Sequence, residues 1–507
     1  MLMKNNIYRS AAQVTAFSTV EKGLSFVYRI ILTRIIGAEG IGIYQICLTV
    51  FSVFLTVASS GVPVTVSRLM AKSNAKNDIS GKHAAVTAGV ICTLAITIPI
   101  ALILFFGRNA FGFLFSDERC VQIFIILLPG LVLTSIYAVI RGSFWGNKQF
   151  LPYSVIELVE DAIMVFAGIA LIWGVADPVI GARNAIYAVL ISYCFSFAAS
   201  LFWYFKKGGK FVNPKKQLKP LLASATPITA MRTATSLLNS AVSVLMPALL
   251  IRACGYSSSE AMSIYGVAMG MAVPLLFAPS ALIGSIAVVV APELSENYYR
   301  KREKAVRYDV EKTVKAAIFI ATVLIPVLFV LGNALSVLLF DNEFCGELVR
   351  NCSFVVLPLC ISLITNTILN SMNCEKRTLL HFCIGAVAMI ICVLFLTRYI
   401  GVYAYGLGLA VSQLICAALN LNLLRKKCDG IAYLKYTLHS VLIIVASCLF
   451  GWLLNGIVSH YLAPVWQLVI CAPLLLGFTV GAQYCLEMVS SRPFKKLFAR
   501  NKKKKAQ

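Results

Sequence analysis

The chain has 507 residues, of which 59% are hydrophobic and only 13% are charged. A soluble protein cannot bury that much apolar surface, and apolar runs of about 20 residues, long enough to cross a bilayer, recur along the chain. Strands of a membrane barrel would show alternating segments of about 10 residues, which this sequence lacks. The composition therefore predicts an all-α polytopic membrane protein.

The apolar runs divide into fourteen predicted transmembrane helices. In chain order they cover residues 11–35, 42–67, 84–107, 120–144, 152–175, 184–205, 221–251, 261–291, 313–336, 348–372, 378–397, 402–424, 436–457 and 463–487.

The net charge of +24 could suggest a nucleic-acid partner, but the positions of the basic residues argue against one. With the N-terminus in the cytoplasm, 35 of the 45 Lys and Arg residues, Arg141 among them, fall in inside segments and 7 in outside segments. This alternating bias is typical of a multi-pass membrane protein and supports fourteen spans with both termini on the cytoplasmic side. The basic tail at 491–507 is either a solvated topological element or a contact with anionic lipids.

The chain also repeats itself. "GRNAFGFLFSD" at 107–117 matches "LGNALSVLLFD" at 331–341, and "LTRIIG" at 32–37 matches "LIRACG" at 250–255. Because six spans is an even number, the two halves enter the membrane with the same orientation. We expect an N-lobe at 1–205, a basic cytoplasmic linker at 206–220 and a C-lobe at 221–427, followed by two extra helices at 428–490.

Charged residues interrupt the first span, where Glu21, Lys22 and Arg29 lie in an apolar stretch. A charge at bilayer depth costs about 2.5–3.5 kcal/mol on insertion scales. Lys22 and Arg29 are two helical turns apart and share a face, and the seventh span carries Arg232. Cations on two repeat-related helices suit a shared cavity that binds an anionic substrate. The alternative is that each is held in a structural salt bridge.

Polar stripes accompany these cations. Ser236 and Asn239 lie on the same face of the seventh span as Arg232, and Asn366 and Asn370 form a stripe on the tenth. They either line the cavity or join helices to one another.

Carboxylates form the third group of intramembrane polar residues. Glu21, Glu160 and Asp161 are candidates for proton or sodium coupling, while Glu157 is placed nearer the cytoplasmic mouth, where we expect it to be solvated. No spacing of His or Cys residues predicts a metal site, and we expect no cofactor.

Two blocks carry a family resemblance, namely "GAEGIGIY" at 37–44 and "SGVPVTVSR" at 60–68. With "LPYSVIELVED" at 151–161 they resemble the polysaccharide-exporter branch of the multidrug/oligosaccharidyl-lipid/polysaccharide (MOP) flippase superfamily, in particular cell-wall-precursor flippases of the stage V sporulation protein B type. The resemblance implies a V-shaped two-lobe transporter. It also implies two arginines in the first span. Arg29 matches the second, and Lys22 replaces the first with a residue that keeps the charge but loses the fork. Glu160 matches a family glutamate.

The function that this resemblance implies is translocation of an isoprenoid-diphosphate-linked saccharide, such as a peptidoglycan or spore-cortex precursor, from inner to outer leaflet. The substrate-binding residues would be Lys22, Arg29 and Arg232. Alternatives are a cation-coupled multidrug exporter, an intramembrane enzyme of envelope synthesis and a non-transporting scaffold. The sequence leaves the sugar, the driving force and the oligomeric state open.

Overall fold

A computed structural model describes residues 2–428, 433–458 and 463–485, and in these ranges it is helical without strands. The predicted tail at 491–507 lies outside the described residues. The helices are α1 (Leu2–Ser59), α2 (Val62–Ala75), α3 (Ile79–Phe106), η1 (Ala110–Leu114), α4 (Glu118–Gly146), α5 (Phe150–Ile172), α6 (Pro178–Lys206), α7 (Lys215–Cys254), α8 (Ser258–Tyr265), η2 (Gly266–Ala272), α9 (Val273–Phe277), α10 (Pro279–Tyr299), α11 (Glu303–Phe340), α12 (Glu343–Cys352), η3 (Ser353–Val355), α13 (Val356–Ser371), α14 (Glu375–Ile400), α15 (Tyr403–Lys427), α16 (Tyr433–Val458) and α17 (Pro464–Cys485).

The prediction of an all-α multi-pass membrane protein is confirmed. Twelve of the described segments are long and apolar enough to span a bilayer. One of them, from Phe17 to Ala75, contains two of the predicted transmembrane helices. The helix α5 is not among the twelve, although it has 23 residues, because it carries three carboxylates. The structure is therefore consistent with the fourteen predicted spans.

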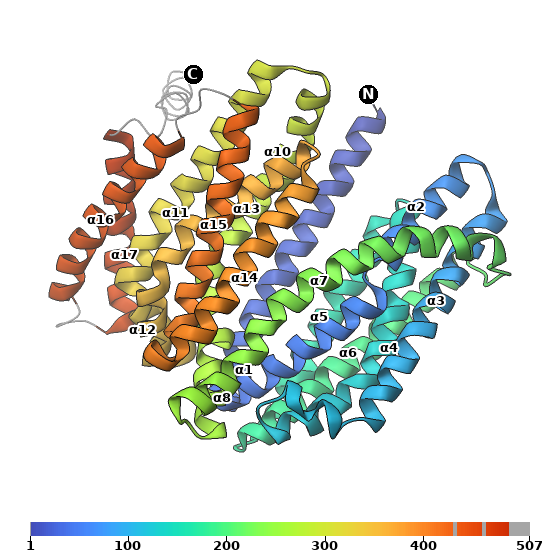
Figure 1. The fold of residues 1–507 in the computed structure, drawn as a ribbon, viewed down its shortest axis with the longest axis horizontal. Coiled ribbons are helices and arrows are strands. Elements are labelled where there is room, and N and C mark those ends of the chain that lie inside the picture. The colour runs from blue at the N-terminus through green and yellow to red at the C-terminus, as the bar shows by residue number, and fades with distance from the viewer. Residues whose placement is uncertain (1, 429–432, 459–462, 486–507) are drawn as a thin grey trace, which may run out of the picture. The chain divides into compact units, whose positions relative to one another are not determined.

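The chain forms two compact units. Unit 1 consists of residues 1–270 and 397–402, and α1 is its central helix, packed against α4, α5, α6, α7 and α8. In unit 2, which holds residues 271–396 and 403–507, α11 has the same role and packs against α10, α12, α13, α16 and α17. Figure 1 shows the helices of each unit. The lobe boundaries expected from the sequence repeat stay a prediction.

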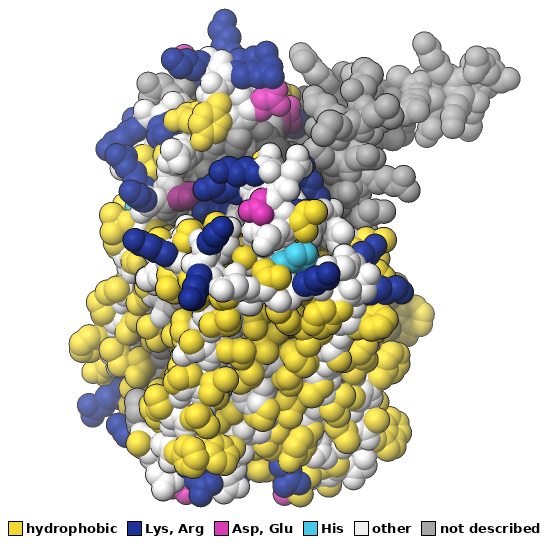
Figure 2. Space-filling view, turned by 90° about the vertical axis from the view of Figure 1, so that its right-hand side faces the viewer, with side chains coloured by type: hydrophobic (Ala, Val, Ile, Leu, Met, Phe, Trp, Pro, Cys, Tyr) yellow, Lys and Arg dark blue, Asp and Glu magenta, His cyan; other side chains and the backbone are white. Residues whose placement is uncertain are grey.

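Apolar side chains cover much of the outer surface. On the face shown in Figure 2 they form a broad band, and Lys and Arg side chains gather mainly along one side of it. Phe106 of α3 is 79% exposed and Leu442 of α16 is 66% exposed. Such exposed apolar side chains on long helices are those that lipid would contact.

The first family block, at 37–44, forms the bend of α1. Gly37 has φ 71°, a conformation that disfavours residues with a Cβ, and it divides α1 into two arms. Gly42 then packs directly on α8, where an added Cβ would overlap the Met262 carbonyl oxygen. Gly266, at the start of η2, faces the same contact from the other side, because its Cβ would overlap the Ala38 carbonyl oxygen. The glycines of the block therefore allow a sharp bend and close backbone packing.

Glu39, from the same block, ties α1 to α4. Its carboxylate lies 2.8 Å from the Arg119 guanidinium, which also pairs with Asp117, the residue that caps α4. Burial would raise the pKa of Asp117, but its hydrogen bonds with Arg119 outweigh burial and hold that pKa below its usual value. The cluster fixes the second arm of α1 against the start of α4.

Candidate functional site

A break between α1 and α2, at Ser60 and Gly61, is held by α7. The Gly61 N–H donates to the Thr229 hydroxyl oxygen at 3.1 Å, and an Arg232 guanidinium N–H donates to the Ser60 carbonyl at 2.8 Å. Within a membrane, backbone groups at such a break need partners from the protein. An added Cβ on Gly61 would overlap the Ala225 carbonyl oxygen, so α7 can come this close only because the residue is glycine.

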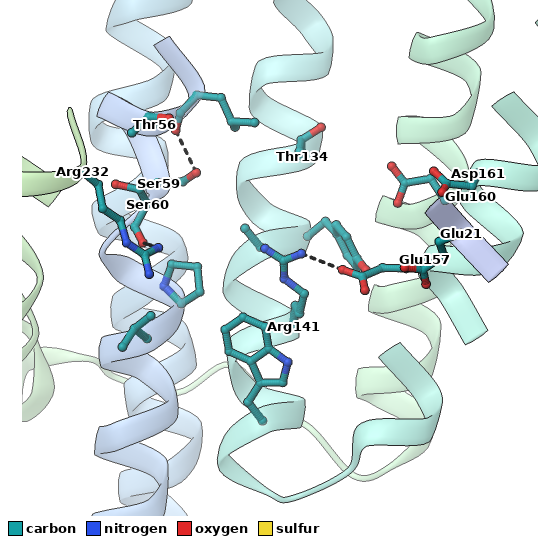
Figure 3. Close-up of a pocket in the computed structure, with 16 residues that line it drawn as sticks. Glu21, Thr56, Ser59, Ser60, Thr134, Arg141, Glu157, Glu160, Asp161 and Arg232 are labelled. Atoms are coloured by element: carbon teal, nitrogen blue, oxygen red, sulfur yellow. Dashed lines mark hydrogen bonds and ion pairs between the residues drawn. The ribbon is translucent and has the colours of Figure 1, made fainter. Parts of the chain in front are cut away.

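This break lines a cavity of about 490 Å³ within unit 1. Its walls come from α1, α2, α4, α5 and α7, and its charged lining residues are Glu21, Arg141, Glu157, Glu160, Asp161 and Arg232. In Figure 3, Arg232 and Ser60 lie on one side of the cavity, the carboxylates lie on the opposite side, and Arg141 lies between them. The cavity is therefore charged at both ends, with opposite signs.

Arg141 is fixed from three directions. Its Nη1 lies 2.6 Å from Glu157 Oε1, and the two side chains are only 31% and 25% exposed. The guanidinium carbon also lies 5.7 Å from the ring centre of Tyr137 and 5.1 Å from that of Trp145, within the range of cation–π contacts. The three α4 side chains are spaced by four residues and share one helix face. This helix face therefore carries an ion-paired guanidinium between two aromatic rings.

Three carboxylates of the cavity form no ion pair with any residue that the structure describes. Asp161 accepts a hydrogen bond from the Ser25 hydroxyl at 3.4 Å, but no ion pair reaches Glu21, Glu160 or Asp161 within the ranges that the structure describes. Once Arg141 and Glu157 neutralise each other, these three acids face a single guanidinium, that of Arg232. In its ionised form this cavity is net acidic.

Several polar atoms of the lining also have no hydrogen-bond partner within the part of the chain that the structure describes. Among the described side chains, the Ser60 Oγ, Thr134 Oγ1 and Tyr137 hydroxyl and the Arg141 Nε are buried without a hydrogen bond. Buried polar groups are normally paired, so a cluster of unpaired ones around a cavity indicates a place for water or for a polar ligand.

The structure brings four of the predicted site residues together, and these come from three different helices. The four, all of which line the cavity, are Glu21, Glu160, Asp161 and Arg232.

Lys22 and Arg29 are not among the lining residues of this cavity. The Lys22 side chain is exposed, whereas Arg29 is half-buried and its Nη1 donates to the Met269 carbonyl at 3.4 Å. The first arm of α1 therefore contributes its acid, Glu21, to the cavity, whereas Lys22 and Arg29 of the same arm do not line it.

The two predicted polar stripes differ in their surroundings. On α7, Ser236 is half-buried and Asn239 is exposed, and neither lines the cavity. In unit 2, Asn366 accepts from the Asn420 amide of α15 at 2.9 Å, and Asn370 accepts from the Thr378 hydroxyl of α14 at 2.7 Å. The stripe on α13 thus joins neighbouring helices, which is one of the two roles expected for it.

Sequence reasoning missed Arg141 as a site residue and treated Glu157 as solvated. Arg141 was assigned to a cytoplasmic segment, and the structure shows that it lies within α4 and pairs with Glu157 of α5. The four-residue spacing of Tyr137, Arg141 and Trp145 could have indicated a cation between two aromatic side chains on one helix face.

Replacing Thr229 with valine is expected to destabilise the protein by about 1–2 kcal/mol, because valine has the same shape but leaves the buried Gly61 N–H unpaired. Thermal unfolding of the detergent-solubilised protein measures the effect. Thr226→Val is the control one turn earlier on α7, since its exposed hydroxyl bonds only to the Leu222 carbonyl of its own helix. Equal midpoints for the two variants would show that Thr229 does not hold the break.

Comparison with known proteins places these features in a family. The model of the family described as polysaccharide biosynthesis protein matches residues 7–298. Stage V sporulation protein B of Bacillus subtilis (strain 168) is 22% identical over 440 residues, which are 83% of each chain. The lipid II flippase MurJ of the same organism is 21% identical over 496 residues, covering 90% of this chain and 91% of the relative.

Solved structures show the same fold. The lipid II flippase MurJ in an inward closed conformation matches with a TM-score of 0.71 at 13% identity, over 94% of this chain and all of that one. An inward-facing multidrug resistance transporter of the MATE family in the MOP superfamily matches with a TM-score of 0.67 at 14% identity, over 81% and 95% of the two chains. The fold is thus that of MOP-superfamily transporters, and because the family model covers more than half of its residues, the chain belongs to the polysaccharide biosynthesis protein family.

Proposed function

We propose that this protein is a flippase, which carries a lipid-diphosphate-linked saccharide from the inner to the outer leaflet of a bacterial cytoplasmic membrane by alternating access. The family and the functions that its relatives are named for support this class of substrate. We propose a peptidoglycan or spore-cortex precursor as the cargo, and a transporter rather than an enzyme as the activity.

The observation that carries the proposal is a guanidinium at a helix break in a membrane cavity. Arg232 lines the cavity beside Ser60, and α2 begins at Val62, so the positive end of the α2 dipole lies at the same place. A guanidinium and a helix N-terminus together suit the oxygens of a diphosphate. The isoprenoid tail would remain in the bilayer while the head group enters the cavity.

The other predicted residues have proposed roles in the same cycle. Lys22 and Arg29 share a face of α1 and would attract the diphosphate before or after it meets Arg232. Glu21, Glu160 and Asp161 would bind a coupling proton or sodium ion, unless the membrane potential alone drives transport. Asn239 and Ser236 on α7 and Asn366 and Asn370 on α13 would present polar groups to the sugar in another state of the cycle.

Reconstitution tests this function. In proteoliposomes loaded with an isoprenoid-diphosphate-linked saccharide, Arg232→Ala is expected to slow arrival of the saccharide in the opposite leaflet by about tenfold, because one bidentate interaction with phosphate is lost. Arg232→Lys should recover only part of the rate, since an ammonium keeps the charge but not the fork. Labelling of the saccharide by a membrane-impermeant reagent gives the rate.

Arg252→Ala serves as the matched control, because Arg252 is exposed in the last turn of the same helix and lies outside the cavity. If the Arg232→Ala variant transported the lipid normally, Arg232 would not be part of the substrate-binding site. Failure of the wild-type protein to move any such lipid, in vesicles where it is correctly inserted, would overturn the proposed function.

A second candidate is a cation-coupled exporter of cationic drugs, and the acidic side of the cavity favours it. Glu21, Glu160 and Asp161 would attract a cationic compound as they would a coupling ion. Efflux of a fluorescent cationic dye from cells that overproduce the protein, with no flipping of the lipid-linked saccharide in vesicles, would establish this candidate in place of the first.

A further inference from the structure

The charge balance of the unit 1 cavity does not match a purely anionic ligand. Arg141 and Glu157 form an ion pair at 2.6 Å and neutralise each other. The remaining charged lining groups are Arg232 and the acids Glu21, Glu160 and Asp161. A diphosphate alone would leave the three acids without a cation, and uncompensated charge at membrane depth is costly unless the acids bind protons.

The remaining charges are also separated in space. Figure 3 places Arg232 beside Ser60 on one wall, and Glu160, Asp161 and Glu21 together on the opposite wall. A ligand that spans the cavity would therefore meet a positive group at one end and negative groups at the other. Complementary charge at each end both favours the right ligand and rejects one with a single sign.

A second observation comes from α4, which lies between the two walls in Figure 3. Tyr137 lines the cavity, its side chain is only 4% exposed, and its hydroxyl has no hydrogen-bond partner among the described residues. The Thr134 hydroxyl, one turn earlier on α4, is unpaired as well. A phenol oxygen can accept a hydrogen bond from an ammonium group or donate one to a sugar oxygen. These groups are satisfied only when something polar occupies the space beside them.

An ammonium group is a cation that this wall can hold without a chelating site. Within the described ranges, no group of three His, Cys, Asp or Glu side chains is close enough to chelate a metal ion. An ammonium group needs only one or two carboxylate oxygens and a hydroxyl, each at hydrogen-bond distance, and it can be carried by a larger head group.

We propose that the saccharide head group carried by this protein is zwitterionic, with its diphosphate held at Arg232 and a free ammonium group held by Glu160, Asp161 and Glu21. The inference rests on the proposed flippase function and narrows its substrate. The amine belongs to the head group, either on the sugar or on a substituent attached to it. An acylated amine, which has lost its charge, makes a poorer ligand for the acidic wall.

Two lipids that differ in one group test this. Both carry an isoprenoid diphosphate linked to a hexosamine, one with a free amine and one with the amine acetylated. The wild-type protein in proteoliposomes is expected to flip the free-amine lipid about tenfold faster, a ratio typical of one additional charge-assisted hydrogen bond. In Glu160→Gln and in Asp161→Asn the ratio of the two rates should fall toward one.

The ratio is measured within each variant, so a smaller fraction of folded protein does not change it. Glu118→Gln, an exposed acid in the first turn of α4 that lies outside the cavity, is the control and should keep the wild-type ratio. Equal rates for the two lipids in the wild-type protein would overturn the inference and leave the flippase function standing. Transport of neither lipid would instead count against the flippase function itself.

Discussion

Replacing Gly266 with alanine is expected to destabilise the protein by about 3 kcal/mol, at the upper end of what overpacking costs. The new methyl group would overlap the Ala38 carbonyl oxygen, which is backbone and cannot rotate away. A Cβ added to Gly42, on the facing helix, would likewise overlap the Met262 carbonyl oxygen, so the two helices meet backbone to backbone. Small residues permit such close packing between membrane helices, and the packing is disrupted when either residue has a larger side chain.

The measurement is the midpoint of thermal unfolding in detergent, followed by the loss of monodisperse protein on size-exclusion chromatography. Gly23→Ala is the matched control, because Gly23 lies in α1 with no atom within 4 Å of an added Cβ. That change should stabilise the protein slightly, by about 0.5–1 kcal/mol, as alanine is the better helix former. A Gly266→Ala midpoint at or above that of the wild type would mean that α1 and α8 are not packed together in this way.

The sequence was sufficient for the helices but not for their bends. Long apolar runs and the alternation of basic residues depend only on local composition, and for this reason the class of fold could be predicted. The bend of α1 at Gly37 and the close packing of Gly42 and Gly266 depend on residues more than 200 positions apart. "GAEGIGIY" was recognised as a family block, but its physical reason became visible only once α8 was placed beside it.

The candidate site was predictable only in part, for a related reason. Intramembrane charge identified Glu21, Glu160, Asp161 and Arg232, because a costly residue is seldom placed at bilayer depth without a role. The same rule gives no indication of which charges meet. It suggested that Lys22 and Arg29 would share a cavity with Arg232, whereas in unit 1 the acids line Arg232's cavity and neither of those two cations does.

Arg141 lies near the end of α4, where the sequence alone does not reveal its partner. A basic residue near the end of an apolar run can be a loop residue that sets topology, and it can equally be the partner of an acid on the next helix. Glu157 is only 16 residues further along, on α5, and the turn between α4 and α5 brings the two side chains within 2.6 Å. The spacing of two antiparallel helices could have suggested this ion pair. It could not have distinguished the ion pair from two side chains that are solvated separately.

Removing only the Arg141 side of this ion pair is expected to cost about 3 kcal/mol, since Glu157 would remain partly buried, unpaired and close to other carboxylates. Arg141→Met keeps the length of the side chain and loses its charge. Adding Glu157→Gln to it removes the stranded charge, so the double variant should be the more stable of the two. Unfolding midpoints of the two single variants and the double variant give the coupling between the residues.

Arg300→Met provides the comparison, because Arg300 and Glu296 form an ion pair of similar length, 2.9 Å, with side chains 56% and 55% exposed. Solvent screens such a pair, and its loss should cost at most about 0.5 kcal/mol. If Arg141→Met were no more harmful than Arg300→Met, Glu157 would have to be solvated after all, as its sequence position suggested. A double variant that is less stable than Arg141→Met alone would point the same way, because neutralising Glu157 helps only if its charge is stranded in the protein.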